Sequence, residues 1–87
     1  MATYEHNSDK FGYLNLEDMQ CVQQGLSKLG FDPGSADGKD GPRTQDAVRK
    51  FQAHESIKID GIVGSETRQA LVQALDREAA EQPAAST

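Results

Sequence analysis

The chain has 87 residues, a net charge of −5 and one cysteine. This length allows one domain and not two, and the single cysteine excludes an internal disulfide. No apolar stretch is long enough to span a membrane, and no basic stripe is present, so we expect neither a membrane nor a nucleic acid as partner.

The N-terminal segment gives little sign of regular structure. Residues 1–13 contain scattered aromatic residues without periodicity, and we interpret them as an N-terminal arm. Residues 1–11 also lack the apolar segment of a secretory signal. We therefore expect the chain to be cytoplasmic, to be exported by a route that needs no such signal, or to be a segment of a longer protein.

A first helix is predicted over residues 15–29. Asn15 is a favourable N-cap residue, and apolar side chains then recur at three- and four-residue steps on one face. Gly30 suits the left-handed position that ends many helices, and Pro33 follows it.

An internal duplication organises the rest of the chain. Residues 37–47 and 60–70 both read D-G-x-x-G-x-x-T-x-x-A without a gap. In each copy the Asp-Gly pair favours a turn, and the residues after the second glycine favour a helix N-terminus. Because each copy precedes a helix of the same domain, we expect the two repeated loops to lie near each other.

The duplication predicts two further helices, over residues 42–54 and 65–77. Each has apolar residues on one face, and we expect Ile57 and Ile59 to fill the core from the connection between them. The fold class is therefore predicted to be all-α, a compact three-helix bundle of residues 14–78. Residues 79–87 lose the periodicity and are interpreted as a flexible tail or linker.

Residues 22–75 resemble the peptidoglycan-binding domain family, which is often found beside cell-wall hydrolases. The resemblance rests on a helical V-Q-x-x-L opening, an L-G-F-D-P-G turn, D-G-x-x-G-P-x-T-x-x-A-V-x-x-F-Q and a closing D-G-x-x-G-x-x-T. It departs from the family at Asp40, where an apolar residue is common, at Ser65, where proline is common, and at Arg68, where tryptophan is frequent.

The resemblance implies a non-catalytic module that binds bacterial cell-wall murein and targets an attached hydrolase or secreted effector to it. The expected site of action is the cell envelope, in the periplasm or cell wall, and we expect a monomer. Without an export signal in the chain, delivery during phage lysis or by a contact-dependent secretion machine becomes an option.

Catalytic and metal sites are not expected from the sequence. His6 and His54 are the only histidines, and we expect His54 to stabilise the end of its helix. Cys21 is predicted to be a buried, inert thiol. One cysteine and two distant histidines form no zinc pattern, and the aspartates lack the spacing of a calcium loop. We expect no cofactor.

The predicted ligand is the stem peptide of a muropeptide, which carries amides, carboxylates and, in many bacteria, a diaminopimelate zwitterion. Arginine and lysine bind carboxylates, and loop groups bind amides. We predict a shallow groove between the two repeated loops. Its candidate residues are Asp37, Lys39, Asp40, Arg43, Gln52, Asp60 and Arg68.

Two other classes of function remain open. The same fold resembles part of the propeptide of some metalloproteases, but Cys21 lies within a predicted helix and not on the extended segment that silences those enzymes. A protein-interaction or adaptor module that uses exposed helices is the main alternative. A stand-alone hydrolase is the least favoured class, because catalytic groups and burial are lacking.

Overall fold

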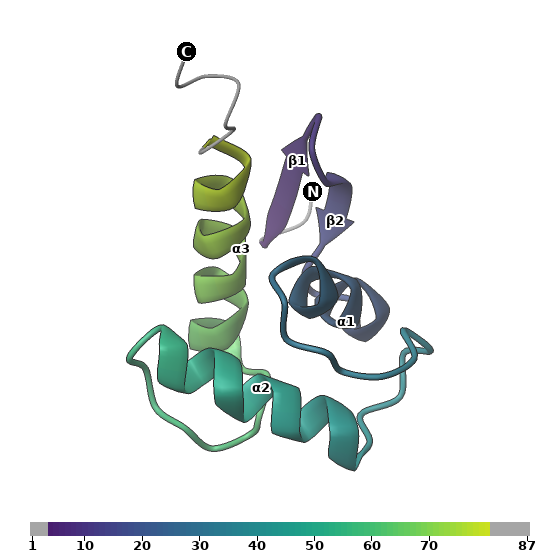
Figure 1. Ribbon diagram of the computed structural model, residues 1–87, viewed down its shortest axis with the longest axis vertical. Coiled ribbons are helices and arrows are strands. Elements are labelled where there is room, and N and C mark those ends of the chain that lie inside the picture. The colour runs from purple at the N-terminus through teal and green to yellow at the C-terminus, as the bar shows by residue number, and fades with distance from the viewer. Residues whose placement is uncertain (1–3, 81–87) are drawn as a thin grey trace.

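The computed structural model describes residues 4–80, which form three helices and a β-hairpin (Figure 1). The elements in chain order are β1 (Glu5–Ser8), β2 (Gly12–Asn15), α1 (Met19–Lys28), α2 (Pro42–His54) and α3 (Ser65–Ala80). The residues of the expected tail beyond 80, and residues 1–3 of the expected arm, lie outside the described part.

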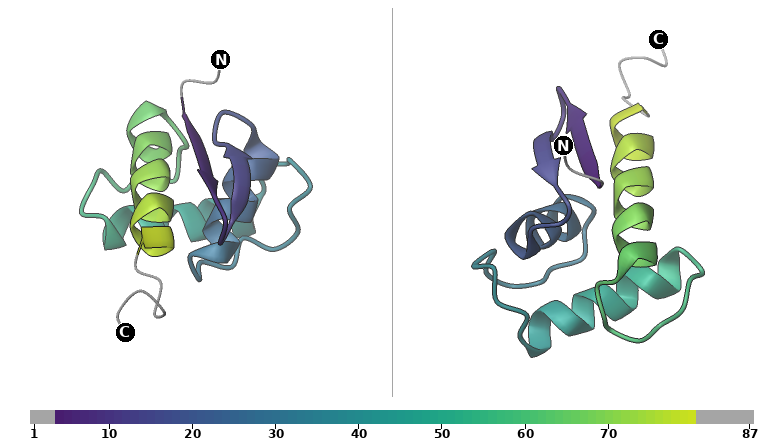
Figure 2. Two further views of the ribbon diagram at one scale, coloured as in Figure 1. Left: turned by 90° about the horizontal axis from the view of Figure 1, so that it is seen from above. Right: turned by 180° about the vertical axis from the view of Figure 1, so that it is seen from behind.

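The all-α prediction is wrong, because two antiparallel strands occupy part of the expected arm and the start of the region that was predicted to be helical. Glu5 pairs with Asn15 and Ser8 with Gly12, and the turn between them places Gly12 at φ +76°. Strand β1 lies between β2 and α3 in all three views (Figures 1 and 2). Each strand has only four residues, too few for a clear period-2 pattern in the sequence.

The first helix is shorter than predicted, and its cap is a different residue. Asn15 ends β2, and its side chain accepts a hydrogen bond from the Glu17 amide at 3.1 Å. Asp18 is the N-cap of α1 and accepts from the Gln20 amide at 3.4 Å. The chain then turns at Gly30, which has φ +93° as the sequence predicted.

The other two helices start where the duplication predicts. Helix α2 has the expected bounds, and α3 begins at Ser65 but continues to Ala80, three residues past the predicted end. The C-terminal half of α3 runs along the hairpin, where Asp76 contacts His6 of β1. The C-terminal part of α3 and the hairpin therefore stabilise each other.

The core is built where the three helices and the hairpin meet. Its buried apolar side chains come from β2, the segment after it, and all three helices: Leu14, Leu16, Val22, Leu26, Ala47, Val48, Phe51, Ala70, Leu71, Ala74 and Leu75. Gly25 of α1 is buried and faces α3, since a Cβ built there would be in van der Waals contact with Leu75 Cδ1 at 3.4 Å. Ile57 packs against this core, but the expectation for Ile59 is wrong, because 57% of it is exposed.

Candidate functional site

The first repeated loop is held by a buried glutamine of α1. Gln23 accepts a hydrogen bond from the Gly38 amide at 2.8 Å and donates to the Lys39 carbonyl at 2.8 Å. It also donates to the hydroxyl of Thr44, at 3.0 Å, and Thr44 lies in the first turn of α2. Gln23 thus fixes the loop to both flanking helices.

The second repeated loop is held in the same way by a buried glutamine of α2. Gln52 accepts from the amides of Asp60 and Gly61, at 3.1 and 3.0 Å. It donates to the Asp60 carboxylate, to the Ile62 carbonyl and to the hydroxyl of Thr67 in α3, at 2.9–3.1 Å. Each loop therefore has the same glutamine–threonine anchor.

This anchoring role was not predicted for either glutamine. Both follow a buried apolar residue within a helix, as the pairs Val22-Gln23 and Phe51-Gln52. That repeated pairing, followed each time by Asp-Gly and a threonine, is the signal that could have predicted the two anchors.

A surface cavity of about 310 Å³ opens beside the first repeated loop, and we call it the first-loop cavity. The loop and the first turn of α2 supply its walls: Pro33, Gly34, Ser35, Asp37, Lys39, Gly41, Pro42, Arg43 and Thr44. Three of the seven candidate residues, Asp37, Lys39 and Arg43, thus come together at one place. Two are cations and one is an anion, so the cavity has mixed charge.

Backbone amides keep the carboxylates around this cavity ionised. The Asp37 carboxylate accepts from the Lys39 amide at 2.9 Å, and this bond lowers the pKa of Asp37 from its usual 3.8. The Gly34 amide lowers the pKa of Asp32 in the same way, with a further contribution from Arg43. Arg43 contacts Asp32 at 2.6 Å, and both side chains are largely exposed. The Arg43 guanidinium is therefore accessible to a ligand.

The other four candidate residues lie outside the walls of the first-loop cavity. Asp40 is an exposed residue of the first loop whose carbonyl accepts from Gln45 at 3.3 Å. Gln52 and Asp60 bond to each other in the second loop. Arg68 donates to the carbonyls of Leu16 and Val63, at 2.9 and 2.7 Å. In the structure the side chains of Gln52, Asp60 and Arg68 make hydrogen bonds within the protein.

The expectation of one groove between the loops is wrong. The loops lie at opposite ends of α2 in all three views (Figures 1 and 2). Each loop is fixed to a different pair of helices, by Gln23 or by Gln52, and these anchors keep the loops apart. The candidate residues therefore occupy separate places.

The two copies present different chemistry. Lys39 of the first loop corresponds to Ile62 of the second in the repeat, and Ile62 is 64% exposed. The second loop thus presents an aliphatic surface, completed by Ile59, where the first presents charges.

The described residues were also compared with the requirements of a metal site and of a membrane-spanning helix. Within residues 4–80, no group of three or more His, Cys, Asp or Glu side chains could hold a metal ion. Across that range, no helix has the length and apolar character needed to cross a membrane.

Cys21 is half-buried, less so than predicted, and lies 3.9 Å from an Asp18 oxygen. His54 ends α2, as expected, and contacts Glu55 at 3.1 Å.

Comparison with known families gives a match over residues 15–71 to the family described as a peptidoglycan binding domain. The matched range includes β2's last residue, α1, both repeated loops, α2 and the first half of α3. Strand β1 and most of the hairpin lie before it.

Three curated relatives share the matched region. A spore cortex-lytic enzyme of Oceanobacillus iheyensis is 43% identical over 58 residues, which cover 67% of this chain and 21% of the relative. A spore cortex-lytic enzyme of Bacillus cereus is 40% identical over 67% of this chain and 22% of the relative. The type VI secretion system spike protein VgrG3 of Vibrio cholerae is 40% identical over 68% of this chain and 7% of the relative. The chain thus matches about a fifth or less of each relative's length.

Proposed function

Since the chain belongs to the peptidoglycan-binding domain family, we propose that its first-loop cavity binds the stem peptides of the cell wall and catalyses no reaction on them. The observation that carries this proposal is the convergence of Lys39, Arg43 and Asp37 on one cavity. A stem peptide carries carboxylates, amides and ammonium groups, so a cavity of mixed charge complements it.

Each of the three side chains has a distinct task in this proposal. Arg43 binds a stem-peptide carboxylate through its planar guanidinium, which suits two parallel hydrogen bonds. Lys39 adds a second positive charge at the same cavity, and the ionised Asp37 attracts the ammonium group of a zwitterionic residue. To bind, Arg43 exchanges its contact with Asp32, which costs little because that pair is exposed.

The biological role that we propose is targeting. Weak attachment to a repeating polymer raises the effective concentration of an attached protein near its substrate, even though each site binds weakly. Two of the relatives are named as lytic enzymes of the spore cortex and one as a secretion spike protein. By analogy, this chain acts in the cell envelope as a monomeric module beside a hydrolase or a delivered effector.

Co-sedimentation with purified sacculi tests this function. We expect the protein to pellet with intact sacculi and to remain in the supernatant when an amidase has removed the stem peptides. Pelleting that is equal with and without stem peptides would contradict stem-peptide recognition.

A protein-interaction module remains a second candidate, and one observation favours it. Ile59 and Ile62 expose apolar surface on the second loop, away from the first-loop cavity. If the protein fails to pellet with sacculi of several wall chemistries, this surface becomes the better candidate site, for a protein partner.

A further inference from the structure

Three hydrogen-bonded polar side chains connect the hairpin to α3. All three lie outside the region that matches the family. His6 of β1 lies 2.6 Å from Asp76 of α3 through Nδ1, and 2.7 Å from the Ser8 hydroxyl through Nε2. His6 is only 2% exposed, whereas Ser8 is half-buried.

The proton positions in this chain follow from hydrogen-bond chemistry. An ionised carboxylate can only accept, so His6 Nδ1 carries a hydrogen and donates to Asp76. In the neutral imidazole, Nε2 then accepts the hydroxyl hydrogen of Ser8. The Ser8 oxygen also accepts from the Phe11 amide at 3.1 Å, which fixes its position. The order is therefore hydroxyl, imidazole and carboxylate, with the hydroxyl poised to lose its proton to the imidazole.

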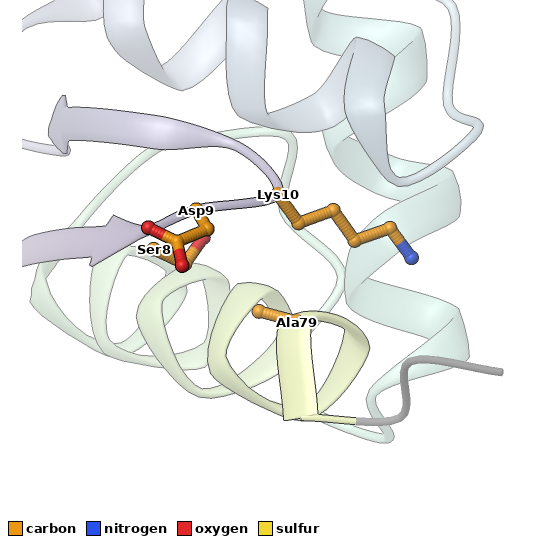
Figure 3. A pocket seen from close by; sticks show the side chains of 4 residues that line it. All are labelled: Ser8, Asp9, Lys10 and Ala79. Carbon is orange, nitrogen blue, oxygen red and sulfur yellow. The ribbon is translucent and has the colours of Figure 1, made fainter. Parts of the chain in front are cut away.

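Ser8 also lines a surface cavity of about 430 Å³, together with Asp9, Lys10 and Ala79 (Figure 3). The side chains of Ser8 and Asp9 lie beside α3, whereas that of Lys10 extends away from them. Ser8 is thus accessible from this cavity, and the His6 imidazole lies directly behind it.

We propose that Ser8 is a nucleophile that His6 activates and Asp76 orients, and that it takes an acyl group from small carboxylic esters. Ser8 Oγ forms a bond to the ester carbonyl carbon, its proton moves to His6 Nε2, and the bond from that carbon to the leaving oxygen breaks. The proton then passes from His6 to the leaving alcohol. In a second step, water attacks the acyl-Ser8 ester with His6 again as base, and this releases a carboxylic acid and restores the Ser8 hydroxyl.

The surroundings of Ser8 define the acyl group and the rate. The cavity lining carries one anion, Asp9, and one cation, Lys10, so it favours a neutral acyl group over one with a net charge. General-base assistance by His6 should accelerate the reaction about 100-fold over an unassisted serine.

Labelling with a fluorophosphonate, followed by peptide mass spectrometry, tests the proposal on the whole folded chain. The exposed residues Ser27 and Ser65 are internal controls, because neither has a hydrogen-bonded histidine among the described residues. We expect Ser8 to be labelled about 100-fold faster than either control serine. Equal labelling of the three serines would overturn the proposal.

Variants distinguish a Ser8 that reacts because His6 activates it from a Ser8 that reacts only because it is exposed. Asp76→Asn is the key variant, because it keeps the size of a side chain that is 62% exposed, and thermal unfolding checks that the hairpin remains packed on α3. It should slow Ser8 labelling about tenfold, because an amide no longer fixes the tautomer of His6. Asp46→Asn, at an exposed position on α2, is the matched control and should change nothing. Labelling that Asp76→Asn leaves unchanged would overturn the proposal.

Ester hydrolysis gives a readout of turnover and of specificity. The wild type should release p-nitrophenol from the acetate ester faster than from the succinate half-ester, which carries a net charge. Ser8→Ala should reduce this release to the background rate, while circular dichroism shows the fold unchanged. If Ser8→Ala retains the wild-type rate, the proposal fails, whatever the outcome with sacculi.

Discussion

Gln52 is the residue on which the second repeated loop depends most. Its side-chain oxygen accepts from two backbone amides, and its two N–H groups are shared among a carbonyl, a carboxylate and a threonine hydroxyl within hydrogen-bond distance. The side chain is fully buried, so no water can replace it without a rearrangement.

Gln52→Ala should therefore lower the free energy of unfolding by about 3 kcal/mol, because it leaves buried polar groups unpaired and opens a cavity. Gln45→Ala on the same helix removes one bond, to the Asp40 carbonyl, and should cost about 0.5 kcal/mol or less. Urea unfolding of the two variants measures both values. Equal losses would show that Gln52 does not anchor the loop.

The two Asp-Gly turns should also make stability depend on acid. The Ile62 amide, and after it Gln52, lowers the pKa of Asp60 from 3.8, and the Lys39 amide lowers that of Asp37. A carboxylate whose pKa is lower in the folded state stabilises the fold above its unfolded pKa. This stabilisation is complete above about pH 5 and is lost as the pH falls through the lowered values.

Replacing both carboxylates tests this pH dependence. The variant Asp37→Asn/Asp60→Asn should lose less thermal stability than the wild type between pH 5 and pH 2.5, because fewer groups change their protonation. Thermal unfolding followed by circular dichroism measures the difference. Asp46→Asn is the control and should follow the wild-type curve, so a steeper decline in the double variant would contradict the assignment.

At the scale of the elements, the hairpin is a part of the core and not an appendage. Leu14 of β2 and Leu16 after it are buried among the helices, and His6 joins β1 to α3. The helix bounds at Pro42 and Ser65 could be predicted because Asp-Gly turns and apolar faces both indicate them. The hairpin could not, because each strand has only four residues and the contact of His6 with Asp76 joins residues seventy positions apart in the sequence.

Leu14→Ala should lower the free energy of unfolding by about 3 kcal/mol if β2 belongs to the core. Tyr13→Ala changes the neighbouring residue, whose ring is exposed and bonds only to Glu5 among the described residues, and should cost about 0.5 kcal/mol. Chemical denaturation of both variants decides the matter. A loss as small for Leu14→Ala as for Tyr13→Ala would place the hairpin outside the cooperative unit.

At the scale of the whole molecule, the duplication has produced two loops that are held by the same kind of glutamine–threonine anchor. The two loops nevertheless present different side chains to solvent. The sequence could indicate that Asp37, Lys39 and Arg43 lie near one another, since they belong to one turn-rich segment, and in the structure all three line the first-loop cavity. It could not separate them from Gln52, Asp60 and Arg68, because the repeat says nothing of where each loop lies. That separation depends on how α2 spans the molecule, with one loop at each end.

The central claim is that the first-loop cavity, and not the second loop, binds the stem peptide. Its most direct test is a titration of the isotope-labelled protein with a soluble muropeptide, followed by amide NMR. We expect the shifts to concentrate at residues 33–44 and to disappear in Lys39→Ala/Arg43→Ala, which retains the fold because both side chains are exposed. Lys50→Ala, an exposed cation elsewhere on α2, should bind as the wild type does. Shifts centred on residues 57–67, or shifts that persist in the double variant, would contradict the claim.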